Sequence, residues 1–197
     1  MKTLKHLKTI LTHKKWVLHY ARKAGITWRG IKHDMSKFSP VEFWESVKYY
    51  QGNRSPIDAC KEANGYSKAW LHHRGRNSHH YEYWTDGYDN GGHPLIMPFE
   101  DAVELLCDYL AAGRAYMGPN FTYGAEYEWW KAKAKKPLMM HTATKLFINA
   151  VLYKLDLLDR LDKDPMLFFT KENLKREYNL YLETWKEHEK NENNRIL

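Results

Sequence analysis

Histidine and aspartate side chains in this sequence are placed where they could bind a divalent metal ion. His33 and Asp34 are adjacent and lie among the apolar residues Ile31, Met35 and Phe38. A buried carboxylate and a buried imidazole each cost several kcal/mol unless they are paired or coordinated, and one divalent ion would satisfy both. The alternative is a chance pair, with the carboxylate at a helix end and the histidine in solvent.

The segment 71–84 holds the densest histidine cluster, with aromatic residues after it. Its four histidines fall within nine positions and form two doublets, His72-His73 and His79-His80. Ligation of a metal or a substrate explains this density best. The alternative is a basic, aromatic loop that binds phosphate or RNA through charge and stacking.

Two carboxylates further along the chain have helical spacing. Glu104 and Asp108 lie one turn apart in a helix that we expect to begin at Pro98 and to end near Gly118. Side chains four residues apart share one helix face, so both carboxylates can point to one place. The alternative is that Asp108 pairs with Arg114 or a neighbouring lysine.

The elements that must position these residues read as helices. Apolar residues recur at three- and four-residue steps over 4–24, which predicts a helix of about five turns. His13 has Ile10 and Val17 among its helical neighbours and should face inward, whereas His19 has basic neighbours and should face outward.

His33 and Asp34 should lie at a junction between helices. After a short connection, Ser39, Pro40 and Glu42 form a capping-box pattern that restarts a helix. A further helix over 57–70 should break or kink near Gly65. Three more helices are expected, at 126–136, at 142–161 and after Thr170. No stretch has the alternating period of a buried sheet, so the sequence predicts an all-α, single-domain helical bundle.

Length and composition fit that class. The chain has 197 residues, and we expect a metal-binding helical domain over 1–165 with a C-terminal helix, 166–197, packed on it and frayed at its end. Two cysteines without CxxC spacing, and no apolar run long enough for a signal peptide or a membrane span, indicate a cytoplasmic protein. The formal charge of +7 favours an anionic partner, although it could serve solubility alone.

In chain order these residues read H…HD…H…H…D, which resembles the HD-domain superfamily of metal-dependent phosphohydrolases. The run HDMSK looks like the HD-x-[GS]-K segment common in that superfamily. The resemblance implies that His13, His33, Asp34 and Asp108 hold a first metal. It also implies that one histidine of each doublet, taken here as His73 and His80, serves a second metal or the scissile phosphate. Imidazole and carboxylate ligands suit Mn, Fe, Co, Ni or Zn, as one or two ions.

A narrower resemblance covers about residues 1–155. The strings THKK, HDMSKFSP, AWLHHRGRNSHHYEYW and MPFEDAVELLCDYLAAGRAYMG are similar to a family of small, uncharacterised bacterial and phage proteins. That family implies no established activity. The two doublets lie close together here, whereas the corresponding histidines of HD enzymes are usually spread over separate helices.

The leading hypothesis is a metal-dependent phosphohydrolase acting on a nucleotide or another small phosphorylated compound. Asp34 would bridge metal and water, and His79 or His80 would handle the leaving-group proton. Lys37 would hold phosphate, unless it is a solvated helix-end cation. The remaining predicted substrate-binding residues are Arg74, Arg76, Asn77 and Arg114.

Two other functions stay open on the sequence. The same ligand types could hold two irons in an HD-type oxygenase. A basic module that binds nucleic acid or protein, with a structural metal or none, would explain the net charge and the aromatic segment 72–84. The aromatic-rich helix 172–187 could form a homo-oligomer surface or complete the monomer core.

Overall fold

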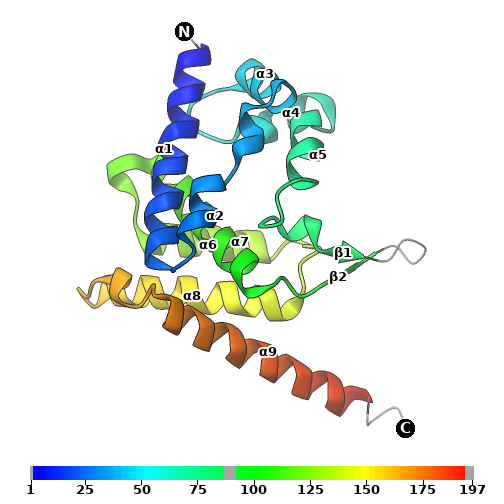
Figure 1. Ribbon diagram of the computed structural model, residues 1–197, viewed down its shortest axis with the longest axis vertical. Coiled ribbons are helices and arrows are strands. Elements are labelled where there is room, and N and C mark those ends of the chain that lie inside the picture. The colour runs from blue at the N-terminus through cyan, green and yellow to red at the C-terminus, as the bar shows by residue number, and fades with distance from the viewer. Residues whose placement is uncertain (1, 87–91, 194–197) are drawn as a thin grey trace.

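The first helix, α1 (Lys2–Lys23), runs along one side of the protein in the computed structural model, which describes residues 2–86 and 92–193 (Figure 1). Its apolar stripe buries Ile10, Val17 and Ala21, as the sequence spacing predicts. His13 lies on this buried side, and His19 is exposed. The helix ends before Gly25, whose φ of 71° is a left-handed conformation that glycine adopts without strain.

A short helix, α2 (Thr27–Lys32), follows where the sequence predicted only a connection. That prediction is wrong because a six-residue helix shows too little apolar periodicity to be recognised. Gly30 allows α2 to pack closely on α1, since a Cβ atom at this position would lie 2.5 Å from the Cβ atom of Ala21. This packing brings the end of α2 beside the middle of α1.

Four short helical elements then form one side of the site: η1 (Met35–Phe38), α3 (Pro40–Tyr49), α4 (Pro56–Asn64) and α5 (Lys68–Arg74). Ser39 caps α3, and its side chain accepts a hydrogen bond from the backbone N–H of Glu42 at 3.5 Å. The capping box is not reciprocal, because the backbone N–H of Ser39 donates to the carbonyl of Ser36 instead. Gly65, with φ of 79°, separates α4 from α5, so the expected break is confirmed.

The rest of the chain is also almost entirely helical. The segment 75–98 contains η2 (Tyr81–Tyr83) and a two-residue antiparallel pair, β1 (Thr85–Asp86) with β2 (His93–Pro94). Residues 87–91, within the glycine-rich polar segment 86–93 that the sequence predicts to be a loop, lie outside the described part. The later elements are α6 (Phe99–Met117), η3 (Gly118–Asn120), α7 (Tyr123–Ala134), α8 (Thr142–Arg160), η4 (Pro165–Leu167) and α9 (Lys171–Asn193). The protein is an all-α bundle, as predicted. Among the described residues, none of the helices is long and apolar enough to cross a membrane.

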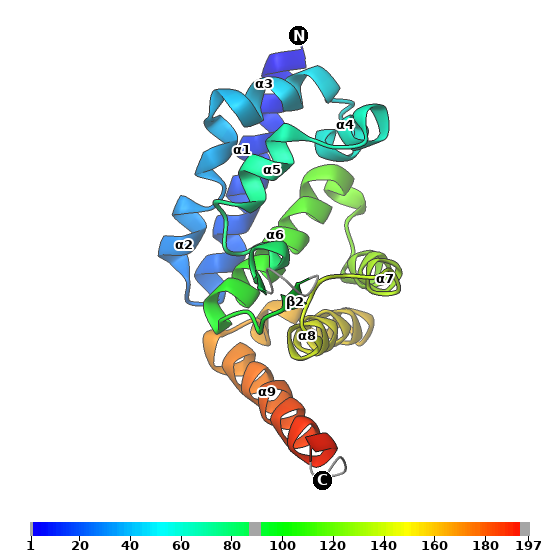
Figure 2. The same ribbon diagram turned by 90° about the vertical axis from the view of Figure 1, so that its right-hand side faces the viewer.

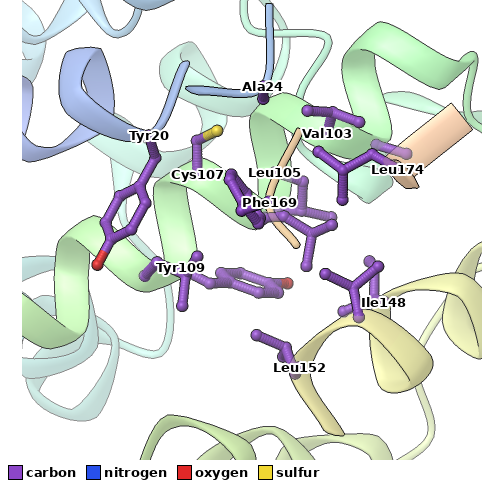
Figure 3. Close-up of a cluster of buried hydrophobic side chains, with 14 of the residues drawn as sticks. Tyr20, Ala24, Val103, Leu105, Cys107, Tyr109, Ile148, Leu152, Phe169 and Leu174 are labelled. Atoms are coloured by element: carbon purple, nitrogen blue, oxygen red, sulfur yellow. The ribbon is translucent and has the colours of Figure 1, made fainter. Parts of the chain in front are cut away.

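The main hydrophobic core lies between α1, α6, α8 and the start of α9 (Figure 3). Leu105, Leu110 and Leu152 are buried there, and Phe169 and Leu174 bring the C-terminal segment into the same core. The helix α9 then extends beyond the bundle (Figure 2). It continues to Asn193, so the predicted frayed end over 190–197 lies partly outside the described residues.

Candidate metal centre

Asp34 lies at the junction between α2 and η1 and has an unusual backbone conformation. Its φ of 54° and ψ of 29° are left-handed, which costs a non-glycine residue about 1–3 kcal/mol and is tolerated best by Asn and Asp. The amine of Lys14 donates to the carbonyl of His33 at 2.5 Å and holds the turn from α1. The carboxylate of Asp34 is thereby directed inward and is 1% exposed.

A first group of candidate ligands comes from α1, the α2–η1 junction and α6. Nε2 of His13 lies 3.0 Å from Oδ1 of Asp108 and 3.7 Å from Oδ2 of Asp34. Nε2 of His33 lies 3.4 Å from the same Asp108 oxygen and 3.2 Å from the same Asp34 oxygen. The four ligand atoms lie within 4.8 Å of one another, so they could surround one metal ion.

A second group uses the other oxygen of Asp34. Oδ1 of Asp34 lies 3.2 Å from Nε2 of His73 and 3.3 Å from Nε2 of His79. His80 completes this group, and each of the four residues offers one atom within the same 4.8 Å limit. The two groups share only Asp34, whose carboxylate has one oxygen facing each of them. This arrangement could hold two ions bridged by Asp34.

The candidate ligand atoms have almost no hydrogen-bond or ion-pair partners outside the two groups. Nε2 of His13, His33, His79 and His80 and both oxygens of Asp34 are buried, and within the described part of the chain the ammonium of Lys37, which pairs with Oδ2 of Asp34, is their one partner from outside the two groups. Buried polar atoms without partners are rare in folded proteins. Ligands about 2.1 Å from a tetrahedral ion lie roughly 3.4 Å apart, which matches the separations of 3.0 to 3.7 Å in the first group. The donor set therefore fits a divalent ion.

Glu104 lies behind two of these histidines. Its Oε1 accepts hydrogen bonds from Nδ1 of His33 at 2.9 Å and from Nδ1 of His79 at 3.1 Å. Arg29 in turn donates to Glu104 at 2.7 Å and also pairs with Asp101. A histidine that donates from Nδ1 presents the lone pair of Nε2, which is the form that binds a metal. Glu104 thus orients ligands, whereas Asp108, one turn later, is a candidate ligand itself.

Glu42 does the same for the second group. Its two oxygens accept hydrogen bonds from Nδ1 of His73 at 2.7 Å and from Nδ1 of His72 at 2.6 Å. The amide of Asn77 donates to the carbonyl of His73 at 2.7 Å and to the hydroxyl of Ser36 at 2.9 Å. Of the first histidine doublet, His73 belongs to a ligand group and His72 does not.

Charge at the site is governed by burial and by the paired groups. Burial disfavours the ammonium of Lys37, but Asp34 and Asp108 outweigh it and raise the pKa of Lys37. Its Nζ lies 2.5 Å from Oδ2 of Asp34. Burial also opposes the charge of Asp34, yet His33 and Lys37 hold the pKa of this carboxyl well below its usual range. Burial, followed by the charge of His79, lowers the pKa of His80, so His80 is a neutral imidazole suited to ligation.

Two cavities open onto these ligands. The His6 cavity has a volume of about 190 Å³ and is lined by His6, Lys37 and ligands of both groups. The Glu126 cavity has a volume of about 400 Å³, is lined by Glu126 and Trp129, and reaches the ligands His80 and Asp108. A small molecule in either cavity can therefore touch the candidate metal centre.

The structure places all four predicted substrate-binding residues outside both cavities, as far as the described lining residues go. Nε of Arg114 donates to the hydroxyl of Tyr20 at 2.6 Å, and its guanidinium lies over Trp16, so it does not pair with Asp108. Arg74 is exposed, and Arg76 bonds weakly to a backbone carbonyl at 3.5 Å. The fourth, Asn77, donates to the carbonyl of His73 and to the hydroxyl of Ser36 instead.

Sequence reasoning missed the roles of Glu42 and His6. Glu42 lies three residues after Ser39, which fits a capping box, so the sequence analysis assigned it to the helix cap alone. His6 is buried, its Nδ1 lacks a hydrogen-bond partner in the described structure, and burial, followed by the charge of Lys37, lowers its pKa to about 4. Its spacing of seven residues from His13, two turns on one helix face, is the signal that could have found it.

The comparisons with known proteins assign a family without a function. A model described as a family of unknown function (DUF5662) matches residues 2–154. Because this is more than half of the 197 residues, the chain belongs to that family. The assignment to the HD-domain superfamily is therefore wrong, whereas the expectation of an uncharacterised family is confirmed. Neither curated proteins nor solved structures give a match.

Proposed function

We propose that this member of the family of unknown function (DUF5662) is a metal-dependent phosphohydrolase acting on a nucleotide or another small phosphorylated compound. The observation that carries the proposal is the shared carboxylate of Asp34, which has one oxygen toward each of two ligand groups, beside a cavity lined by Lys37. We further propose two ions of Mn, Fe, Co, Ni or Zn, because neutral imidazoles and carboxylates suit these metals.

A divalent ion supplies Lewis acidity, which lowers the pKa of a coordinated water and polarises phosphoryl oxygens. The residues of the chain contribute orientation and charge. Glu104 and Glu42 fix the imidazoles with Nε2 toward the centre. Lys37 keeps its positive charge at the wall of the His6 cavity, where it would bind a phosphoryl oxygen and stabilise the charge that develops there.

Hydrolysis would form a bond from a water oxygen to phosphorus and break the bond from phosphorus to the leaving oxygen. The proton that the water loses balances the proton that the leaving oxygen gains. His79 and His80 were expected to handle this proton. Their geometry now supports ligation more strongly, because His79 donates Nδ1–H to Glu104 and His80 is neutral.

We also propose a cytoplasmic location. Cys60 and Cys107 are both free and buried, which suits a reducing compartment.

The test is phosphate release from a panel of nucleoside monophosphates, sugar phosphates and a chromogenic phosphate ester, with each candidate metal added. We expect turnover by the wild-type protein and its loss in His13→Ala. His19→Ala is the matched control, because His19 lies on the same helix but is exposed.

Phosphate release that persists in His13→Ala, or that is absent with every substrate and metal, would contradict the proposal. Oxygen uptake by the iron-loaded protein without phosphate release would favour the oxygenase alternative. Salt-sensitive binding of single-stranded RNA without turnover would favour the binding module.

A further inference from the structure

The Glu126 cavity lies beside the proposed reaction site and is twice as large as the His6 cavity, at about 400 Å³ against about 190 Å³. Its walls come from the start of α4, from Trp70 and Tyr81, and from α6 and α7, and α4 and α7 lie on the same side of the molecule (Figure 2). It reaches His80 and Asp108, one candidate ligand from each group. A molecule that fills this cavity can therefore present a phosphoryl group to the metal centre.

The cavity is lined by five tryptophan and tyrosine side chains, which are Trp70, Tyr81, Tyr109, Tyr116 and Trp129. The rings of Tyr109 and Trp129 meet edge to face, with centroids 5.0 Å apart. Trp129 remains 46% exposed, so part of its ring is available for contact. Aromatic walls favour a planar ring, which can adopt offset stacking or edge-to-face geometry against them.

Lys133 adds a cation to these walls. Its Nζ lies 5.3 Å from the ring centroid of Trp129 and 5.5 Å from those of Tyr81 and Tyr109. No carboxylate lies within ion-pair distance of this ammonium in the described part of the chain. Lys133 is therefore free to donate hydrogen bonds to acceptors of a bound molecule.

Glu126 is the least expected residue in the cavity. It is only 5% exposed, and no described residue forms a hydrogen bond or ion pair with its carboxyl group. Burial, followed by the charge of Asp108, raises the pKa of Glu126 to about 8. An acidic residue in the first turn of α7 suits the helix dipole, but an exposed residue would provide the same benefit without desolvation.

Space for this carboxyl group is made by Gly113 on α6. A Cβ atom at that position would lie 2.1 Å from Oε2 of Glu126, so any larger residue would displace the carboxyl group. A buried acid that has no protein partner and that lines a cavity is best explained by a ligand that completes its hydrogen bonds.

We propose that the Glu126 cavity binds the nitrogen-containing ring of a nucleoside, with the ring stacked on Trp129 and a ring N–H or amino group donating to Glu126. The substrate class is thereby narrowed to nucleotides. The choice of a nucleotide as substrate rests on the proposed phosphohydrolase function, but the binding of the nucleoside does not.

Size separates the two cavities. Small-molecule sites usually have volumes of roughly 300–1,000 Å³, which includes the Glu126 cavity and excludes the His6 cavity. The nucleoside thus belongs in the Glu126 cavity, and the phosphoryl group belongs at the ligands that border both cavities. A sugar phosphate without a base would leave the aromatic walls and Glu126 without a partner.

The experiment is calorimetric titration of the 197-residue protein with adenosine, guanosine, cytidine and uridine, and with ribose as the sugar alone. We expect at least one nucleoside to bind and ribose not to bind at the same concentrations. Trp129→Ala and Glu126→Leu should each weaken nucleoside binding by about ten-fold or more, through loss of stacking and of the hydrogen-bond acceptor respectively. Trp28→Ala, which removes a 65% exposed indole that lines neither cavity among the described residues, should leave binding unchanged.

Two results would overturn the inference: no nucleoside binds at millimolar concentration, or affinity is unchanged in both variants while their melting temperatures match the wild type. If one variant has a lower melting temperature than the wild type, the affinity of the other variant serves as the test. Nucleosides carry no phosphate, so their binding is independent of turnover. Nucleoside binding without phosphate release would retain this inference and contradict the proposed hydrolysis, whereas hydrolysis of sugar phosphates without nucleoside binding would do the reverse.

Discussion

The two sides of α6 differ in whether the surrounding protein satisfies the side chains that they carry. One side carries Leu105, Leu106 and Leu110, all fully buried within the described core. The other side carries Glu104 and Asp108, which face the histidines of the candidate metal centre. Apolar side chains need only close packing, and the core provides it. The Nε2 atoms of the buried imidazoles and Oδ1 of Asp34 need partners that the described residues outside the two groups do not provide.

This difference indicates on which side of α6 a ligand is expected to bind. The apolar side of α6 is complete without any ligand, so its residues should determine stability. On the polar side, Glu42 and Glu104 orient the candidate ligands from behind toward one centre. The residues of this side should determine metal content and activity, with smaller effects on folding.

The largest expected effect is the loss of the shared ligand in Asp34→Asn. Asn tolerates the left-handed backbone at this position and keeps the size of the side chain, but it loses the charge that faces both groups. We expect metal content to fall to background and phosphate release to fall by about a thousand-fold or more. Elemental analysis and turnover measure these losses, and circular dichroism checks the fold. Full metal content in a folded Asn variant would contradict the bridging role.

Leu110→Ala should show the opposite pattern. Removing a fully buried leucine from the core should lower the free energy of unfolding by about 2–5 kcal/mol. At denaturant concentrations below the midpoint of unfolding, the metal content per folded chain should equal that of the wild type. Denaturant titration and elemental analysis measure the two quantities. Leu4→Ala, at a 73% exposed position, is the control and should change stability by less than about 0.5 kcal/mol. Loss of metal at unchanged stability in Leu110→Ala would remove the contrast between the two sides.

Glu104→Gln should affect the metal centre from behind. The amide keeps the shape of Glu104 but weakens the acceptor that holds Nδ1 of His33 and of His79. We expect metal affinity to fall by about 10- to 100-fold, the usual range for residues that orient metal ligands. Competition with a chelator of known affinity measures it. Glu100→Gln, in the exposed first turn of the same helix, is the control. An unchanged affinity in Glu104→Gln would contradict its orienting role.

The smallest effect is a pH dependence from Glu126. Because the pKa of Glu126 is raised from 4.5 to about 8, the unfolded chain ionises first as pH rises, and stability is lost between these two values. Glu126→Gln should remove this loss and already be more stable than the wild type by about 2 kcal/mol near pH 6, roughly 1.5 units above the ordinary pKa. Thermal unfolding at several pH values measures the difference. A difference that is independent of pH across this window would contradict the raised pKa.

The sequence was informative about local structure. Periodicity placed His13 on the buried side of α1 and His19 on the exposed side, and Gly65 marked the break between α4 and α5. These features depend on neighbours within one helical turn or on one residue with a special backbone conformation. Such signals are carried by the sequence itself.

Contacts between distant segments could not be read in the same way. Glu42 fits a helix cap locally, yet its carboxylate binds His72 and His73, thirty residues later. Arg114 looked like a phosphate or Asp108 partner, yet it bonds Tyr20, which precedes it by 94 residues. Each residue had an adequate local or charge-based interpretation, and only the packing of α1, α3, α5 and α6 decided between the alternatives.

The most direct test of the central claim is elemental analysis of the protein purified without a histidine tag and without chelator, beside Asp34→Asn and His19→Ala. The account predicts one or two ions of Mn, Fe, Co, Ni or Zn per chain in the wild type and in His19→Ala, and background in Asp34→Asn. A wild type that contains no metal, and that stays empty after incubation with each of these ions, would contradict it.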